Sequence, residues 1–171
     1  MGRVAVAILA IVLAWSATLK FEAPAGWVVK PPASSMRIAE FTLPKVEGDP
    51  EDAELAIFYF GPTQGGTVQA NLSRWIGQMT QPDGRPSADV AKTSTFTSHG
   101  LNVTLVDISG TYVAEVTPGS SDHFNKPAFR QCAAVVETDG GPYFVKLTGP
   151  EKTVAKWNDS FTTFLRTLRY E

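Results

Sequence analysis

The chain has 171 residues, of which 43% are hydrophobic and 19% charged, and its formal net charge is -2. This length fits one domain with enough apolar side chains for a core. Both signs of charge are scattered along the sequence. The composition therefore argues against a nucleic-acid binder, which needs a basic face, and against a polybasic membrane-surface segment.

The first residues are typical of a secretory signal peptide. Arg3 precedes an unbroken apolar run over residues 4–15, which is too short to span a bilayer as a helix. Small residues stand at the -3 and -1 positions of a cut after Ser16. We therefore predict a signal peptide over residues 1–16 and an exported domain over residues 17–171, with no transmembrane span in the mature chain. A buried first element and a wrongly chosen start codon remain open alternatives.

Alternating and apolar runs predict about seven strands. They cover residues 19–22 continued at 27–29, then 36–43, 55–60, 92–98, 101–108, 129–138 and 142–148. The run 55–60 is nearly all apolar, which indicates a central strand covered on both faces. His99-Gly100 and Asp139-Gly140-Gly141 are expected at hairpin turns. The single cysteine, Cys132, lies in an apolar strand and is expected to be a buried hydrophobe.

Two segments have helical periodicity. The first apolar face comprises Val68, Leu72, Trp75, Ile76 and Met79, after Thr67 as a suitable N-cap. The second begins at Pro150-Glu151 and comprises Val154, Trp157, Phe161, Phe164, Leu165 and Leu168. Together the elements predict an α+β fold, with an antiparallel sheet of about six or seven strands covered by helices.

This order of elements resembles the PsbP-like domain over residues 19–170. The features that carry the resemblance are LKFEAPAGW at residues 19–27 and YFVKLTGP at residues 143–150. A further stretch, GTVQANLSRW at residues 66–75, looks like a signature of uncharacterised exported bacterial proteins. PsbP-like proteins are non-enzymatic; plant members are extrinsic subunits of photosystem II, and other relatives bind protein partners. The resemblance implies the fold and binding or assembly work.

Catalytic and metal-binding motifs are absent from the sequence. His99 is expected at a turn, and His123 follows Ser120 and Asp122 on one loop, where a catalytic triad rarely keeps its geometry. The acidic residues over 47–54 fail the spacing of a calcium-binding loop. We therefore predict no metal site, no cofactor and no enzymatic activity. A hydrolase-like enzyme that uses His123 with Ser120 or Asp122 is the alternative.

Candidate binding residues come from two places. The stretch 109–128 has no periodicity, and loops of this length often bind partners, although a strand extension over residues 112–116 remains open. Arg74 and Gln78 share a polar strip of the first helix. The predicted binding residues are Tyr112, His123, Phe124, Lys126, Arg74 and Gln78. The sequence thus predicts an exported binding or assembly domain with a protein partner in the cell envelope; a structural envelope component without a pocket is a third possibility.

Overall fold

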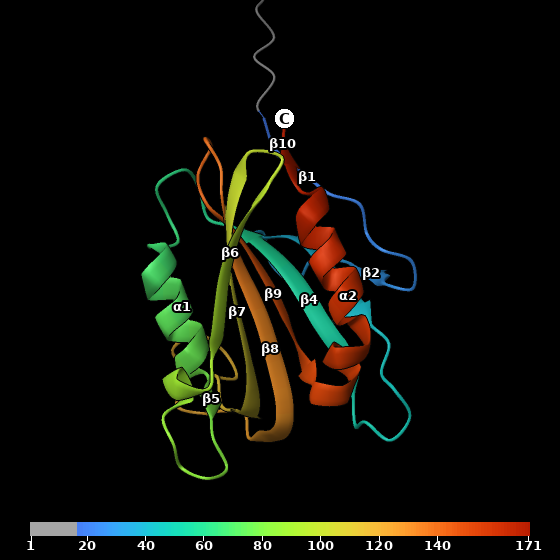
Figure 1. The fold of residues 1–171 in the computed structure, drawn as a ribbon, viewed down its shortest axis with the longest axis vertical. Coiled ribbons are helices and arrows are strands. Elements are labelled where there is room, and N and C mark those ends of the chain that lie inside the picture. The colour runs from blue at the N-terminus through green and yellow to red at the C-terminus, as the bar shows by residue number, and fades with distance from the viewer. Residues whose placement is uncertain (1–16) are drawn as a thin grey trace, which may run out of the picture.

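The computed structural model describes residues 17–171 and places two helices on opposite faces of an eight-stranded antiparallel sheet (Figure 1). The predicted α+β class with an antiparallel sheet is confirmed. The elements in chain order are β1 (Leu19–Lys20), β2 (Val28–Lys30), β3 (Arg37–Leu43), β4 (Ala53–Tyr59), α1 (Val68–Gly77), β5 (Met79–Thr80), a short 3₁₀ helix (Ser87–Asp89), β6 (Lys92–Ser98), β7 (Leu101–Tyr112), β8 (Lys126–Glu137), β9 (Tyr143–Pro150), α2 (Glu151–Thr167) and β10 (Arg169–Tyr170).

The strands of the large sheet follow the order β2-β3-β4-β9-β8-β7-β5, and β6 also pairs with β7. A separate two-stranded pair joins β1 to β10, so that the two ends of the described chain meet. The count of eight exceeds the expected six or seven partly because Met79, assigned to the first helix from its spacing, instead begins β5. Helix α1 ends at Gly77.

The larger core lies between the sheet and α2. Alternate residues of β8, among them Cys132 and Ala134, face this helix, and the ring of Phe161 is buried against the same cluster. Phe164 and Leu168 are also buried, whereas Trp157 is half-buried and its indole N–H donates to the carbonyl of Pro44 at 2.9 Å. The expected apolar face of the last helix is therefore correct, and so is the burial of Cys132.

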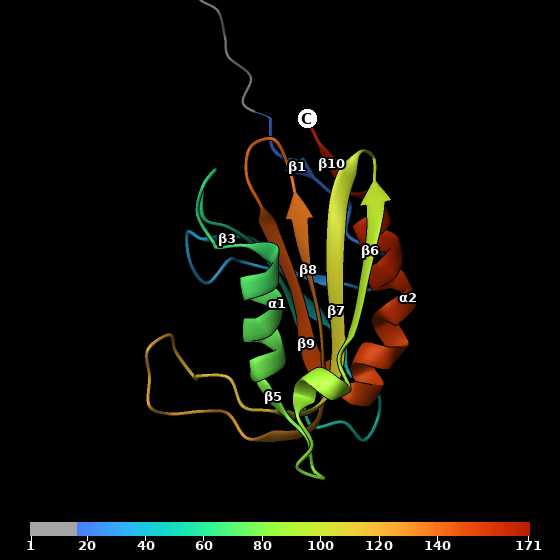
Figure 2. The ribbon, with the colours of Figure 1, turned by 60° about the vertical axis from the view of Figure 1, so that its left-hand side comes forward.

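The opposite face of the sheet packs against α1. Ala133 and Val135 of β8 join Leu72 and Trp75 of the helix in a second cluster. Thr67 caps the helix as expected, because its hydroxyl accepts from the N–H of Ala70 at 3.1 Å. Helix α1 contacts β7 and β8, and Figure 2 shows the two helices on either side of the sheet. The expected cover of β4 on both faces is only partial, since this short helix does not reach across it.

The expected long loop 109–128 is largely structured. Strand β7 continues to Tyr112 and β8 begins at Lys126. Residues 113–125 form a small hairpin, in which the N–H of Val116 donates to Asp122 and that of Phe124 to Ala114, both at 2.9 Å. This hairpin extends beyond the sheet near β5 and the end of α1 (Figure 2). The strand extension that the sequence left open is therefore correct as far as Tyr112.

The predicted signal peptide falls on residues 1–16, outside the described residues. Among residues 17–171, no helix has both the length and the apolar content needed to cross a membrane.

Candidate functional site

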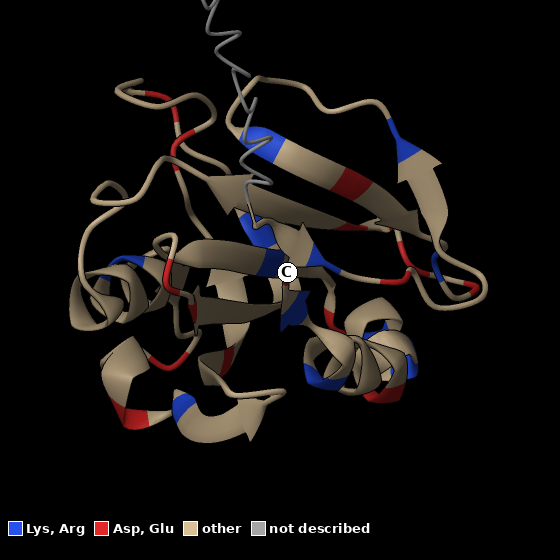
Figure 3. Ribbon diagram, turned by 90° about the horizontal axis from the view of Figure 1, so that it is seen from above, with Lys and Arg blue, Asp and Glu red and all other residues tan. Residues whose placement is uncertain are grey.

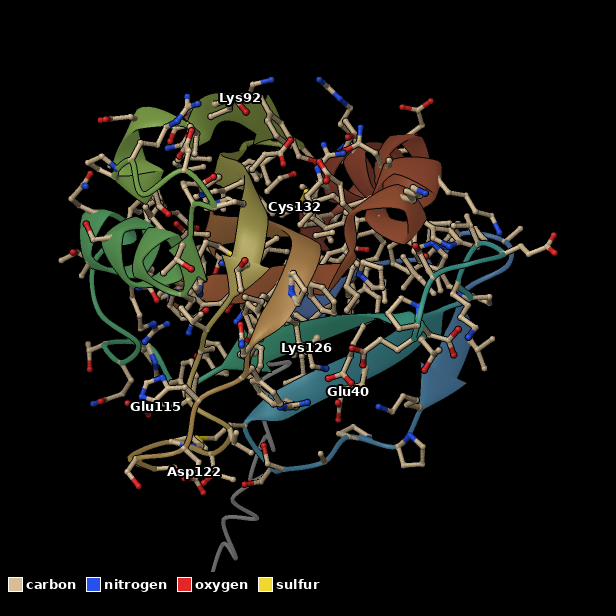
Figure 4. All side chains as sticks on the ribbon, turned by 90° about the horizontal axis from the view of Figure 1, so that it is seen from below. Glu40, Lys92, Glu115, Asp122, Lys126 and Cys132 are labelled. Carbon is tan, nitrogen blue, oxygen red and sulfur yellow. The ribbon has the colours of Figure 1, made fainter. Side chains whose placement is uncertain are left out.

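A cavity of about 790 Å³ lies on the face of the sheet that α1 covers only in part. It lies over three cross-strand pairs between β4 and β9: Ala56 with Lys146 forms its floor, and Glu54 with Thr148 and Phe58 with Phe144 lie on either side of that pair. Helix α1, Arg37 of β3 and the hairpin 113–125 form its walls. In Figure 4, Lys126 and Glu40 lie on this side of the sheet, whereas Lys92 lies on the far side.

All six residues that the sequence predicted for binding line this cavity. They are Arg74 and Gln78 from the α1 side, and Tyr112, His123, Phe124 and Lys126 from the hairpin and its flanking strands. Arg74 and His123 are exposed, and the other four are half-buried. Two segments chosen from the sequence for separate reasons are thus brought together by the fold. That these residues bind a ligand stays a prediction.

Lys146 is the polar group at the centre of the floor. Its ammonium donates to Oε1 of Gln78 at 2.7 Å and to the hydroxyl of Tyr112 at 3.2 Å. The Tyr112 ring lies 5.2 Å from the same nitrogen. Both hydrogen-bond partners are neutral, and among residues 17–171 no salt bridge includes Lys146.

This environment changes the titration of the lysine. The pKa of Lys146 is lowered from 10.5 to about 7, chiefly by burial and also by the positive charges of Arg74 and Arg37, with Glu54 opposing them. Burial likewise raises the pKa of the Tyr112 hydroxyl to about 12. Near neutral pH, therefore, the tyrosine is protonated and the lysine is poised between its two forms.

The other basic groups around the cavity are mostly paired with carboxylates. Lys126 pairs with Glu51 at 2.7 Å, and Arg37 pairs with Glu54 at 3.1 Å. Arg37 also lies 2.5 Å from the buried Glu40. Burial raises the pKa of Glu40, but hydrogen bonds from the Ala33 N–H and from Arg37 outweigh it, so the pKa of this carboxyl is lowered.

Arg74 is the exception besides Lys146, because its guanidinium donates to the neutral Oδ1 of Asn71 at 2.6 Å. Charges of both signs are spread over the ribbon in Figure 3. Within residues 17–171, Lys146 and Arg74 thus lack the carboxylate partners that Arg37 and Lys126 have, which net charge does not reveal.

Aromatic rings supply much of the remaining surface. Phe58 stacks on Phe60 with centroids 6.0 Å apart, and Phe60 lies 5.6 Å from Phe144. On the hairpin side, Tyr112 stacks on Phe124 at 5.7 Å. The ammonium of Lys126 lies 4.9 Å from the Phe124 ring, which helps to hold the hairpin against the sheet. The cavity thus combines an apolar wall with a cationic floor.

The hydrolase alternative required Ser120 or Asp122 beside His123. Instead, Nδ1 of His123 lies 2.9 Å from the carbonyl oxygen of Val113. The hydroxyl of Ser120 accepts from the backbone N–H of Asp122 at 2.9 Å, a local turn contact. These contacts fix the hairpin and do not link the three side chains as a triad would.

The acidic segment 47–54, whose spacing does not fit a calcium-binding loop, has structural contacts. The carboxylate of Asp49 accepts from the N–H of Thr153 at 3.0 Å and from its hydroxyl at 2.6 Å, and so caps the first turn of α2. Glu51 and Glu54 form the ion pairs described above. In the described part of the chain, no group of three or more His, Cys, Asp or Glu is placed to hold a metal ion.

A second cavity of about 360 Å³ lies on the α2 side of β7 and β8, lined by Asp107, Arg130 and Glu151 among others. Arg130 forms two hydrogen bonds to the Asp107 carboxylate, at 2.8 and 2.7 Å. The neighbouring Cys132 thiol is buried, which raises its pKa to about 12. In this second cavity Arg130 and Asp107 already satisfy each other, so the larger cavity is the better candidate site.

Sequence reasoning did not single out Lys146. In a strand with period two, a lone lysine is usually on the solvent side. A signal was present nonetheless: Phe144 shares its face, and an aromatic residue two positions away indicates that the face is covered.

The fold and the site define a small α+β domain with a lined cavity on one face of its sheet. No protein-family model matches the sequence, and no curated protein is similar to it at a significant level. The resemblance to PsbP-like domains therefore stays a prediction.

Solved structures are similar to this one at low sequence identity. One is LpqN, which is involved in cell envelope biogenesis of Mycobacterium tuberculosis: the TM-score is 0.51 with 12% identity, over 91% of this chain and 84% of that one. Another is PA94, a Pseudomonas aeruginosa protein of unknown function, with a TM-score of 0.48 and 15% identity over 91% of this chain and 97% of that one.

Proposed function

We propose that this chain is an exported, non-enzymatic binding domain of the cell envelope, and that its ligand occupies the cavity around Lys146. The observation that carries the proposal is the cavity itself, which has about 790 Å³ of space, aromatic walls and a few convergent polar groups. Volumes of roughly 300–1,000 Å³ with such a lining are usual for small-molecule sites. A purely structural component was expected to lack a pocket.

The side chains support binding over catalysis. Cys132 is buried with a raised pKa and is a poor nucleophile. His123 lies at the rim and contacts a backbone carbonyl. Lys146 holds two neutral partners, and no carboxylate or histidine within residues 17–171 is hydrogen-bonded to it. A protein partner in the cell envelope stays a prediction.

The envelope location rests on two observations that are independent of the cavity. The apolar run over residues 4–15 predicts export. LpqN, which shares the fold, is a protein of cell envelope biogenesis. Intact-mass measurement of protein isolated from its native cells should show the loss of about the first 16 residues, as the predicted cut requires. Full-length protein recovered from the cytoplasm would refute export.

Gly77 offers a direct test of the cavity. It lines the cavity, and a β-carbon added there would meet no other atom within 4 Å. Gly77→Trp should therefore place an indole in the cavity without disturbing the core. Ser73→Trp is the matched control, because Ser73 is an exposed residue of the same helix outside the cavity lining.

The readout is the small-molecule content of protein purified from its own cell envelope, measured by mass spectrometry after organic extraction. Wild type and the Ser73→Trp control should carry the same compound, and Gly77→Trp should lose it. Equal loading of the two tryptophan variants, or no bound compound in any of them, would contradict the proposed function.

A further inference from the structure

We propose that the ligand is a small amphipathic anion, whose carboxylate or phosphate group binds Lys146 and whose apolar body packs on Phe58, Phe60 and Phe144. This inference rests on the proposed function and names the chemical class that the cavity takes. The argument uses the unused hydrogen-bond donors, the pairing of charges and the aromatic wall.

The floor of the cavity has donors to spare. An ammonium has three N–H groups, and Lys146 uses two of them on Gln78 and Tyr112. The Tyr112 hydroxyl accepts from the lysine, so its own O–H remains available. The hydroxyl of Thr148, two residues along β9 on the same face, is buried with no hydrogen-bond partner among the described residues. An oxyanion, which only accepts hydrogen bonds, matches such a set.

Charge pairing favours the same sign of ligand. The carboxylates Glu51 and Glu54 line the cavity, but they pair with Lys126, Lys30 and Arg37. The other two lining carboxylates, Asp52 and Glu115, accept from the backbone N–H groups of Lys45 and Gly119. Within residues 17–171 Lys146 has no carboxylate partner, and the nearby Arg74 guanidinium donates to an amide oxygen. A buried cation without a counter-ion is unfavourable, and an anionic group bound beside it removes that penalty.

The aromatic wall indicates what the rest of the ligand is. The rings of Phe58 and Phe60 are half-buried and stack at 6.0 Å, and Phe144, which is almost fully buried, borders the cavity 5.6 Å from Phe60. Phe144 is also two residues from Lys146 on the same face of β9. An anionic head at Lys146 thus places an attached alkyl chain or ring against this wall, where removal of its apolar surface from water favours binding.

Binding should be coupled to protonation of the lysine. The pKa of Lys146 in the free protein is about 7, and a bound anion raises it. Between these two values one proton is taken up on binding, so Kd should rise about tenfold per pH unit above pH 7 and stay level below it. The charged and titratable groups that share the cavity with Lys146 are Arg37, Glu51, Asp52, Glu54, Arg74, Tyr112, Glu115, His123 and Lys126.

The test is isothermal titration of the exported domain with decanoate, decanol and acetate, which separate the anionic head from the apolar body. Decanoate should bind at least tenfold more tightly than either decanol or acetate. Decyl phosphate and inorganic phosphate form the second pair and determine which oxyanion is preferred. Lys146→Met should lose the preference for decanoate over decanol.

Lys146→Arg distinguishes the effect of the positive charge from the effect of its loss at high pH, because arginine stays charged at every pH at which Kd is measured. It should retain the preference for decanoate and lose the pH dependence of Kd. Circular dichroism of each variant checks that it is folded, and Lys92→Met, a change of an exposed lysine on β6, serves as the control.

Equal affinity for decanol and decanoate would overturn the anion inference while leaving a ligand-binding cavity in place. Unchanged decanoate binding by Lys146→Met would overturn it as well. If wild type binds none of the probes, although Gly77→Trp loses the compound that wild type carries, the ligand class alone would be refuted. Failure of the Gly77→Trp comparison would refute the proposed function.

Discussion

Lys146→Met tests the physical state of the candidate site without any ligand. The pKa of Lys146 falls from 10.5 in the unfolded reference to about 7 in the folded protein. The two values differ by about 3.5, and at 1.36 kcal/mol for each pKa unit the charged form is disfavoured by at most about 5 kcal/mol. Because the open cavity admits solvent to the lysine, we expect screening to leave roughly half of this.

The variant should therefore be more stable than wild type by about 2 kcal/mol at pH 7. Methionine is a flexible apolar residue of similar length. It removes the desolvated ammonium, and it leaves Gln78 and Tyr112 at the cavity surface, where solvent can satisfy them.

The pH dependence has a defined sign. Since the folded pKa lies below the unfolded one, the unfolded chain binds more protons between about pH 7 and pH 10.5. The wild-type free energy of unfolding therefore gains from this group as pH rises through that window. The advantage of Lys146→Met is then largest at or below pH 7 and should shrink as pH rises toward 10.5.

The assay is urea denaturation of both proteins at several pH values from 6.5 to 9.5, with Lys92→Met as the control for loss of one surface charge. A variant that is less stable than wild type by more than about 1 kcal/mol at pH 7 would refute the reasoning. A stability gain that does not shrink by pH 9 would show that burial of the charge is not its cause.

Other predictions address the scaffold around the site. Phe161→Ala should destabilise the domain by about 3–5 kcal/mol in urea denaturation, because the ring is buried in the α2 core; a loss under about 1 kcal/mol would contradict that packing. Asp49→Ala should cost about 1 kcal/mol, since its carboxylate caps α2, whereas Asp49→Ser should retain most of the stability. His123→Ala should change stability by no more than about 0.5 kcal/mol, as is usual at exposed positions; if wild type hydrolyses generic esters or peptides and this variant does not, the non-enzymatic proposal fails.

Periodicity predicted most of the fold because burial on both faces leaves a clear pattern. Val103 and Val106 of β7 belong to different clusters, as their alternation required. The helical spacing that included Met79 extended the first helix too far. A 3.6-residue pattern predicts a buried Met79 whether the helix continues for one more turn or the chain enters an edge strand. The pattern alone cannot distinguish the two.

Only the residues around the edge of the candidate site could be predicted from the sequence. Tyr112 and Phe124 stood out because they lay in a stretch without period, and Arg74 because it lay beside an apolar helical face. These residues come together because of the sheet order, which places the end of β7 close enough to β9 for Tyr112 to contact Lys146. The pairings that set this order join segments far apart in the sequence. Lys146 has no local signal of its own, since its environment is made by α1, β4 and the hairpin together.

In the described part of the chain, Lys146 lacks an ion-pair partner although carboxylate side chains line the same cavity. Glu54 lies on the neighbouring strand in the same cavity. It nevertheless pairs with Lys30 of β2 and Arg37 of β3. Methionine at position 146 would fill similar space beside Phe144 without the cost in stability of an ammonium group held out of water. A sequence that keeps the lysine therefore accepts lower stability at this one position. Such departures from the local rules of packing are expected where a protein binds its ligand, and an anion at Lys146 is the partner that removes the cost.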